Sequence, residues 1–141
     1  MSSEEERMNN LVAEIRVLEG TFNDLSARQN LLERILIETR TSLETLAGLG
    51  STKTEEVLVP VGGGILLRSS PPLTDTVLLN VGANVVLEKT REFATKFLET
   101  RATEVEESVV ALANQRNQIA QRLDSDRRAL QEILNRAGQG Q

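Results

Sequence analysis

The chain has 141 residues and a net charge of −5, and it contains no cysteine, histidine, tryptophan or tyrosine. Without cysteine and histidine, disulfides and zinc or copper sites are not expected, and the commonest general base and the strongest nucleophile of enzymes are missing. The acidic balance argues against nucleic acid as the main partner, because phosphate binding needs a basic surface. We therefore expect no enzyme activity and no cofactor, and the length fits one domain, residues 1–141.

Residues 3–48 are predicted to form one long helix. Ser3 and Glu6 have the spacing of a capping box, and Gly48 and Gly50 are expected to end the helix. Seam residues recur in alternating steps of three and four, which keeps them on one face and makes that face the seam of a left-handed coiled coil. They are Met8, Leu11, Ile15, Leu18, Phe22, Leu25, Gln29, Leu32, Leu36, Thr39, Leu43 and Leu46.

Residues 56–88 are predicted to form two β-hairpins. Four β-branched and apolar runs, at residues 57–61, 65–68, 76–81 and 85–88, flank turns at residues 62–64 and 82–84, and residues 69–73 form the loop between the hairpins. The triple glycine at 62–64 lacks the Lys-Ser/Thr that completes a phosphate-binding loop. We therefore assign it to a turn and expect no nucleotide there.

The predicted strands are apolar on both faces, so they need cover on both sides. Isolated hairpins are marginal in water, and unpaired strand edges attract other chains. We therefore predict that residues 56–88 are an assembly module. Its expected oligomerisation residues are Val57, Val59, Ile65, Leu67, Val77, Leu79, Val81, Val85 and Leu87.

Residues 90–137 are predicted to form a second heptad helix. Thr90 is expected to cap it, and Phe93, Ala94 and Phe97 are expected to pack its base against the strands. Its seam residues are Thr95, Leu98, Ala102, Val105, Val109, Leu112, Arg116, Ile119, Leu123, Asp126, Leu130, Ile133 and Ala137. The predicted fold class is α+β, a long antiparallel two-helix coiled coil joined by two β-hairpins.

Four polar residues, Gln29, Thr39, Arg116 and Asp126, interrupt the two seams. We interpret them as residues that set the register or reach out to water. If the helices pair as a hairpin, Gln29 falls roughly across from residues 112–116, and a Gln29–Arg116 contact is then expected.

The start of the first helix and the end of the second are expected to meet at a tip far from the strands. The seam residues there either bury one another or leave an apolar patch, which is a common mark of an interaction site. Methionine at such a site adapts to varied partners. The candidate residues are Met8, Leu11, Val12, Ile15, Leu130, Ile133 and Leu134.

Two segments are the most specific in the chain: Leu-Val-Pro-Val-Gly at residues 58–62, and Val-Gly-Ala-Asn at 81–84, which leads into Glu88 and Lys89. With the order helix, two hairpins, helix, they resemble the alpha-class prefoldin subunit in its archaeal form along essentially the whole chain. Asn84 stands where the family often has glycine. Asparagine tolerates positive φ, so the turn is expected to form.

The resemblance implies a hexamer of two alpha and four beta subunits, in which this chain meets a second alpha chain and beta subunits through an inter-subunit β-barrel. It also implies an ATP-independent chaperone that captures unfolded client proteins at the coiled-coil tips and delivers them to a group II chaperonin. The acidic N-terminus has no signal-peptide character, and no apolar run is long enough to span a bilayer. A cytoplasmic protein without a membrane partner is therefore expected.

Two other interpretations remain open from the sequence. A coiled-coil tether or a self-assembling filament of prefoldin-like chains would share the fold without binding clients. An RNA-gripping helical hairpin is disfavoured by the acidic balance and the lack of aromatic residues for stacking.

Overall fold

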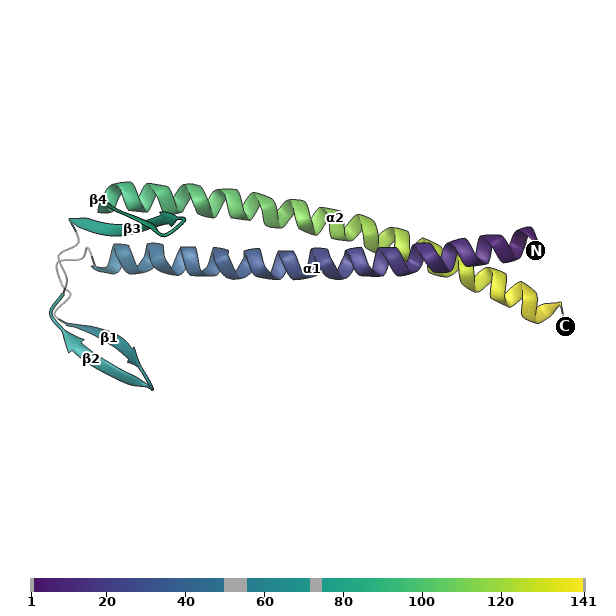
Figure 1. Ribbon diagram of the computed structural model, residues 1–141, viewed down its shortest axis with the longest axis horizontal. Coiled ribbons are helices and arrows are strands. Elements are labelled where there is room, and N and C mark those ends of the chain that lie inside the picture. Colours follow the sequence, from purple (N-terminus) through teal and green to yellow (C-terminus); the bar gives the residue numbers. More distant parts are fainter. Residues whose placement is uncertain (1, 50–55, 72–74, 141) are drawn as a thin grey trace. The chain divides into compact units, whose positions relative to one another are not determined.

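The structure, a computed structural model, describes residues 2–49, 56–71 and 75–140 (Figure 1). Its elements are α1 (Ser3–Leu49), β1 (Val57–Gly62), β2 (Ile65–Ser69), β3 (Thr76–Gly82), β4 (Val85–Thr90) and α2 (Arg91–Gln139). The predicted α+β class, with two long helices joined by two hairpins, is confirmed. The helix end expected at Gly50 and the loop residues 72–73 lie outside the described residues.

The N-terminus of α1 is capped by Ser2, whose Oγ accepts a hydrogen bond of 3.2 Å from the backbone N–H of Glu5. The predicted cap at Ser3 is wrong by one residue, because Ser3 is already helical and the residue before it takes the cap position. Glu4, Glu5 and Glu6 fill the first turn, where negative charge complements the helix dipole. The helix runs to Leu49, one residue beyond the predicted end.

The start of α2 agrees with the prediction. Thr90 Oγ1 accepts a hydrogen bond of 3.1 Å from the backbone N–H of Phe93, which makes Thr90 the cap. The helix continues to Gln139, two residues past the predicted seam, and the N–H of Gly140 closes its last turn on the carbonyl of Arg136. Neither helix, as far as the structure describes it, holds an apolar stretch that could cross a membrane.

The two hairpins have the same turn geometry. β1 pairs antiparallel with β2 and β3 with β4, and each pair has a register irregularity just before the turn, between Pro60 and Gly62 and between Asn80 and Gly82. Both central turn residues have positive φ: 59° and 78° at Gly63 and Gly64, and 51° and 61° at Ala83 and Asn84. Positive φ at both positions is the requirement of a type I′ turn. The expectation that Asn84 tolerates this conformation is confirmed.

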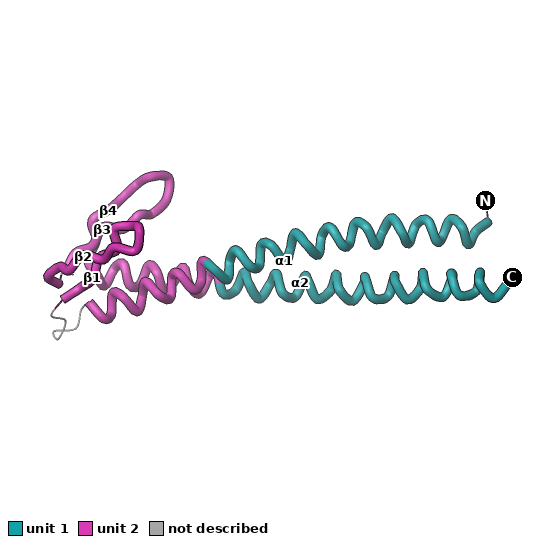
Figure 2. The backbone as a smooth tube through the Cα atoms, turned by 90° about the horizontal axis from the view of Figure 1, so that it is seen from below, with its two compact units in different colours: residues 1–34, 106–141 teal, residues 35–105 magenta. Residues whose placement is uncertain are grey.

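The chain divides into two compact units (Figure 2). The first, called here the helical unit, contains residues 1–34 and 106–141, and in it α1 and α2 run antiparallel side by side. Its buried apolar residues are Leu123 and Ile133. The second, called here the strand unit, contains residues 35–105, and Leu36 and Ala94 are buried in it.

Candidate functional site

The predicted tip lies in the helical unit, where α1 begins and α2 ends, and its seven candidate residues divide into two groups. Ile133 is only 5% exposed, so it is a core residue of the helix pair. Met8, Leu11, Ile15 and Leu130 are half-buried in the same seam. Val12 and Leu134 each follow a seam residue, and they are 42% and 47% exposed. The apolar surface of the tip is therefore made mainly by the two residues that flank the seam.

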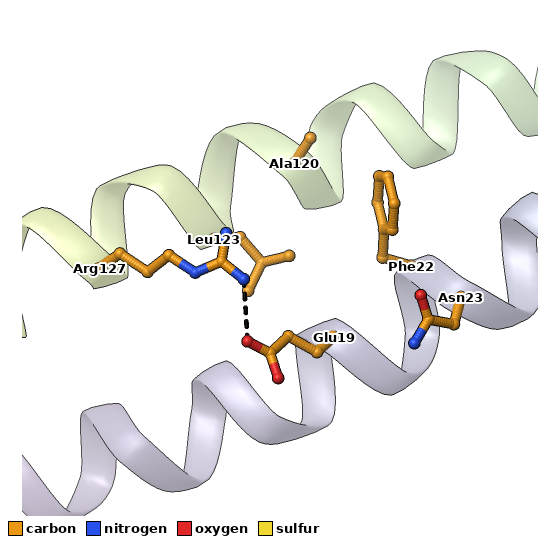
Figure 3. A pocket seen from close by; sticks show the side chains of 6 residues that line it. All are labelled: Glu19, Phe22, Asn23, Ala120, Leu123 and Arg127. Atoms are coloured by element: carbon orange, nitrogen blue, oxygen red, sulfur yellow. Dashed lines mark hydrogen bonds and ion pairs between the residues drawn. The ribbon is translucent and has the colours of Figure 1, made fainter.

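Two ion pairs between α1 and α2 show the register of the helix pair, that is, which residues of one helix lie opposite which residues of the other. Arg122 Nε lies 2.8 Å from Glu14 Oε1, and Arg127 Nη2 lies 2.8 Å from Glu19 Oε1 (Figure 3). The hydrogen bond and the charge of Glu14, followed by the charge of Asp126, raise the pKa of Arg122 above its ordinary value. Glu14 and Arg122 each precede a seam residue, whereas Glu19 and Arg127 each follow one. The two pairs therefore mark the two sides of the seam.

Val12 and Leu134 lie one heptad closer to the tip than the Glu19–Arg127 ion pair. Val12 is seven residues before Glu19, and Leu134 is seven residues after Arg127. Because a heptad returns a residue to the same side of a coiled coil, Val12 and Leu134 occupy at the tip the positions that Glu19 and Arg127 occupy further in. The two positions that hold an ion pair in one heptad hold exposed apolar side chains in the next heptad towards the tip. We call Val12 and Leu134 the tip pair.

A hollow beside the ion pair offers little for chemistry. It is lined by Glu19, Phe22, Asn23, Ala120, Leu123 and Arg127 (Figure 3). Its two charged side chains, Glu19 and Arg127, are bound to each other. In the part of the chain that the structure describes, no three acidic, histidine or cysteine side chains gather as metal ligands would.

The polar residues of the seams differ in how well they are satisfied. The hydroxyl of Thr39 donates to the carbonyl of Ile35 at 2.8 Å, within its own helix. Gln29 Nε2 donates to Glu33 Oε1 at 3.1 Å. Gln29 Oε1 and Asp126 Oδ2 are both buried, and neither has a hydrogen-bond partner among the residues that the structure describes.

The expected Gln29–Arg116 contact is wrong. Gln29 bonds to Glu33 one turn along its own helix. The guanidinium of Arg116 lies 6.0 Å from the ring centroid of Phe22, in cation–π range. The register of the ion pairs sets Leu112, rather than Arg116, opposite Gln29.

The β1–β2 hairpin carries exposed aliphatic side chains on both faces. Val59 pairs with Leu67 on one face, and Leu66 pairs with Pro60 on the other. The sequence predicted that both faces are apolar, but the predicted oligomerisation residues of this hairpin lie on the first face and omit Leu58 and Leu66, which are both exposed. The run of adjacent apolar residues at 57–61 and 65–67 was the signal that both faces are apolar. The predicted residues of this hairpin remain candidates, and the second face joins them.

The β3–β4 hairpin packs one face on the helices of its own unit. Val77 and Leu79 line a hollow with Leu46, Ala94 and Leu98. Val81 lines a second hollow, together with Phe93 and Phe97. Of the three residues predicted to pack the α2 base against the strands, Ala94 is buried, whereas Phe93 is 46% exposed. On the opposite face, Leu78 and Val86 are exposed.

Comparison with known proteins agrees with this architecture. The sequence matches the prefoldin subunit family over residues 5–136. The prefoldin subunit alpha of Nitrosopumilus maritimus is 28% identical over 130 residues, which cover 92% of this chain and 90% of that protein. The prefoldin subunit alpha of Methanoculleus marisnigri is 31% identical over 141 residues, covering 90% of this chain and 93% of the relative.

Among solved structures, the filamentous PFD of Methanocaldococcus jannaschii, determined by cryo-EM, covers 86% of this chain and 95% of its own, at 25% identity and a TM-score of 0.47. The family match and the archaeal alpha subunits of nearly equal length confirm the resemblance seen at residues 58–62 and 81–84. The chain therefore belongs to the prefoldin family, whose members are chaperone subunits that assemble with one another.

Proposed function

We propose that this chain is an alpha-class subunit of a cytoplasmic hexamer of two alpha and four beta subunits. The hexamer captures unfolded polypeptides at its coiled-coil tips without ATP and delivers them to a group II chaperonin. The subunit catalyses no reaction and needs no cofactor. The observation that carries the proposal is the tip pair, two exposed aliphatic side chains in the positions where the neighbouring heptad, one step further from the tip, has an ion pair.

The hairpins support the assembly part of this proposal. In the described part of the chain, each two-stranded sheet leaves both outer edges unpaired, and β1–β2 exposes aliphatic side chains on both faces. Exposed edges with apolar faces favour pairing with strands of other chains. We therefore assign the hairpins to an inter-subunit β-barrel. Leu58, Leu66 and Leu78 contribute to its contacts, together with seven of the nine residues expected from the sequence: Val57, Val59, Ile65, Leu67, Val81, Val85 and Leu87. The other two, Val77 and Leu79, face the helices of their own unit.

The size of the tip pair explains how clients can be held and still be released. Burying the exposed half of one valine and one leucine side chain contributes about 2–3 kcal/mol in total. That is less than the roughly 4 kcal/mol that corresponds to a millimolar Kd. One tip alone therefore binds a client weakly. Several tips on one platform add effective concentration, so capture is strong while each contact breaks without ATP.

An aggregation assay tests client capture. The chain is mixed with its beta-class partner, and a chemically denatured aggregation-prone protein is diluted into the mixture without ATP. Val12→Asp with Leu134→Asp is expected to reduce protection severalfold while the assembly keeps its mass. Val17→Asp is the matched control, because Val17 is an exposed valine of the same helix that lies away from the seam. Protection by the double variant equal to that by the control would refute the assignment of the tip pair.

Mass measurement tests assembly and separates the hexamer from the filament or tether. The chain is measured alone and then with the beta-class partner. Leu66→Asp places a charge on an exposed apolar face of β2 and is expected to yield dispersed subunits. Ser69→Asp, in the same strand, adds the same charge at an exposed polar position and is expected to leave assembly intact. A hexamer of normal mass with Leu66→Asp would contradict the role of that face.

A further inference from the structure

Asp126 stands out because it is a carboxylate inside an apolar seam. It lies three residues after Leu123 and four before Leu130, at a position where heptads place core residues. It is 5% exposed, and its Oδ2 has no hydrogen-bond partner among the described residues. Nothing in client capture by the tip pair, or in assembly by the hairpins, uses this group.

The positive charge beside Asp126 neutralises it only in part. Arg122 Nε lies 3.5 Å from Asp126 Oδ1, which is outside good hydrogen-bond range for this geometry. The same Nε hydrogen bonds to Glu14 at 2.8 Å. Arg122 is thus shared between two carboxylates and bound closely to the other one. A buried charge that is incompletely paired destabilises the packed state and favours any state in which water reaches it.

The location of Asp126 decides which part of the helix pair its hydration would open. The register of the ion pairs sets Asp126 opposite Ile15, with the Leu11–Leu130 and Met8–Ile133 layers beyond it towards the tip. The two ion pairs of 2.8 Å, Glu14–Arg122 and Glu19–Arg127, lie at the level of Asp126 or further from the tip. Beyond Asp126, the cross-helix ion pair in the described residues is Arg136–Glu4, at 3.9 Å. Between Asp126 and the tip, the two helices are therefore held together by a longer ion pair than on the side of Asp126 away from the tip.

We propose that Asp126 is a built-in opening point of the tip. Separation of residues 3–14 from residues 127–139 brings water to the Asp126 carboxylate, and this hydration offsets part of the cost of exposing the apolar layers beyond it. The open state then offers Met8, Leu11, Leu130 and Ile133 to an unfolded polypeptide, in addition to the tip pair. This role in capture rests on the proposed function, whereas the opening itself is a property of the free protein.

Amide hydrogen exchange on the full chain, assembled with its partner and without client, tests the opening. Asp126→Leu replaces the buried charge with an apolar residue that suits the seam. It is expected to slow exchange of residues 3–14 and 127–139 by about tenfold or more. Asp126→Asn keeps the shape, removes the charge and is expected to slow exchange by a smaller factor. Both variants keep the tip pair unchanged.

Gln29→Leu is the matched control, because Gln29 is also a buried seam residue with an unpartnered oxygen, but it lies far from the tip. It is expected to leave exchange at residues 3–14 and 127–139 unchanged. Equal exchange at the tip in Asp126→Leu and the unmodified protein would overturn the proposal. An equal slowing by Gln29→Leu would also overturn it, since the effect would then be general stabilisation.

The aggregation assay on the same variants tests the use of the opening. Asp126→Leu is expected to protect a denatured client severalfold less well, although its helix pair is more stable. Full protection by Asp126→Leu, together with slowed exchange, would overturn the role of the opening in capture. If the unmodified assembly protects no client, the proposed function fails, while the exchange rates still decide whether Asp126 opens the tip.

Discussion

The turn of the β3–β4 hairpin offers a test of backbone strain that can be worked out from the structure. Ala83 has φ of 51°, in the left-handed region, where a residue with a Cβ is less stable than in the right-handed region by roughly 1–2 kcal/mol. Glycine avoids this cost but loses more backbone entropy on folding, by roughly 0.5–1 kcal/mol. We therefore expect Ala83→Gly to stabilise the hairpin by roughly 0.5–1 kcal/mol.

The first hairpin provides the reverse experiment. Gly63 occupies the equivalent turn position with φ of 59°, and no atom outside its chain neighbours lies within 4 Å of where its Cβ would stand. Gly63→Ala is thus expected to destabilise β1–β2 by a similar amount, through backbone conformation alone. Amide exchange of residues 57–69 and 76–90 measures both effects as roughly two- to fivefold changes in protection. Unchanged or weaker protection of β3–β4 in Ala83→Gly would refute the reasoning.

Two further predictions concern the helical unit. Leu123→Ala removes a buried seam side chain and is expected to lower the free energy of unfolding, measured by urea denaturation, by about 2–5 kcal/mol. Val17→Ala, at an exposed position, should change it by less than about 0.5 kcal/mol. Equal effects of the two substitutions would argue against the burial of the seam. Glu19 and Arg127 are both about half exposed, so a double-mutant cycle should give a coupling free energy of about 0.2–1 kcal/mol. This coupling should fall with added salt, because solvent ions screen the pair. A coupling that does not change with salt would contradict this reasoning.

Local sequence patterns predicted the elements well. The heptads of both helices and the glycine-containing turns set the element order, and the boundaries differ from the observed ones by at most two residues. The error at the N-terminal cap has a local cause. Ser2 and Ser3 are chemically equivalent caps, and the choice depends on which of them is the first helical residue.

The candidate site was harder to predict, because a heptad stripe does not say how deeply each of its members is buried. Ile133 and Leu134 are adjacent and similar in size, yet one is buried in the seam and the other is exposed at the tip. The apolar second face of β1–β2 was predicted from consecutive apolar residues in the sequence. Its residues were missing from the predicted oligomerisation residues, because that set followed one alternating face of each strand.

The sequence by itself determined two seams, two hairpins and their order, because helix period, strand alternation and turn residues act over a few neighbouring positions. Only the tertiary structure decided the register between the helices, because sliding one seam by a heptad keeps the apolar stripe and changes which side chains meet. Two ion pairs, each between residues 108 positions apart in the sequence, mark the observed register. That register places Val12 and Leu134 on the same side of the seam and Asp126 opposite Ile15, and it sets Leu112 rather than Arg116 opposite Gln29.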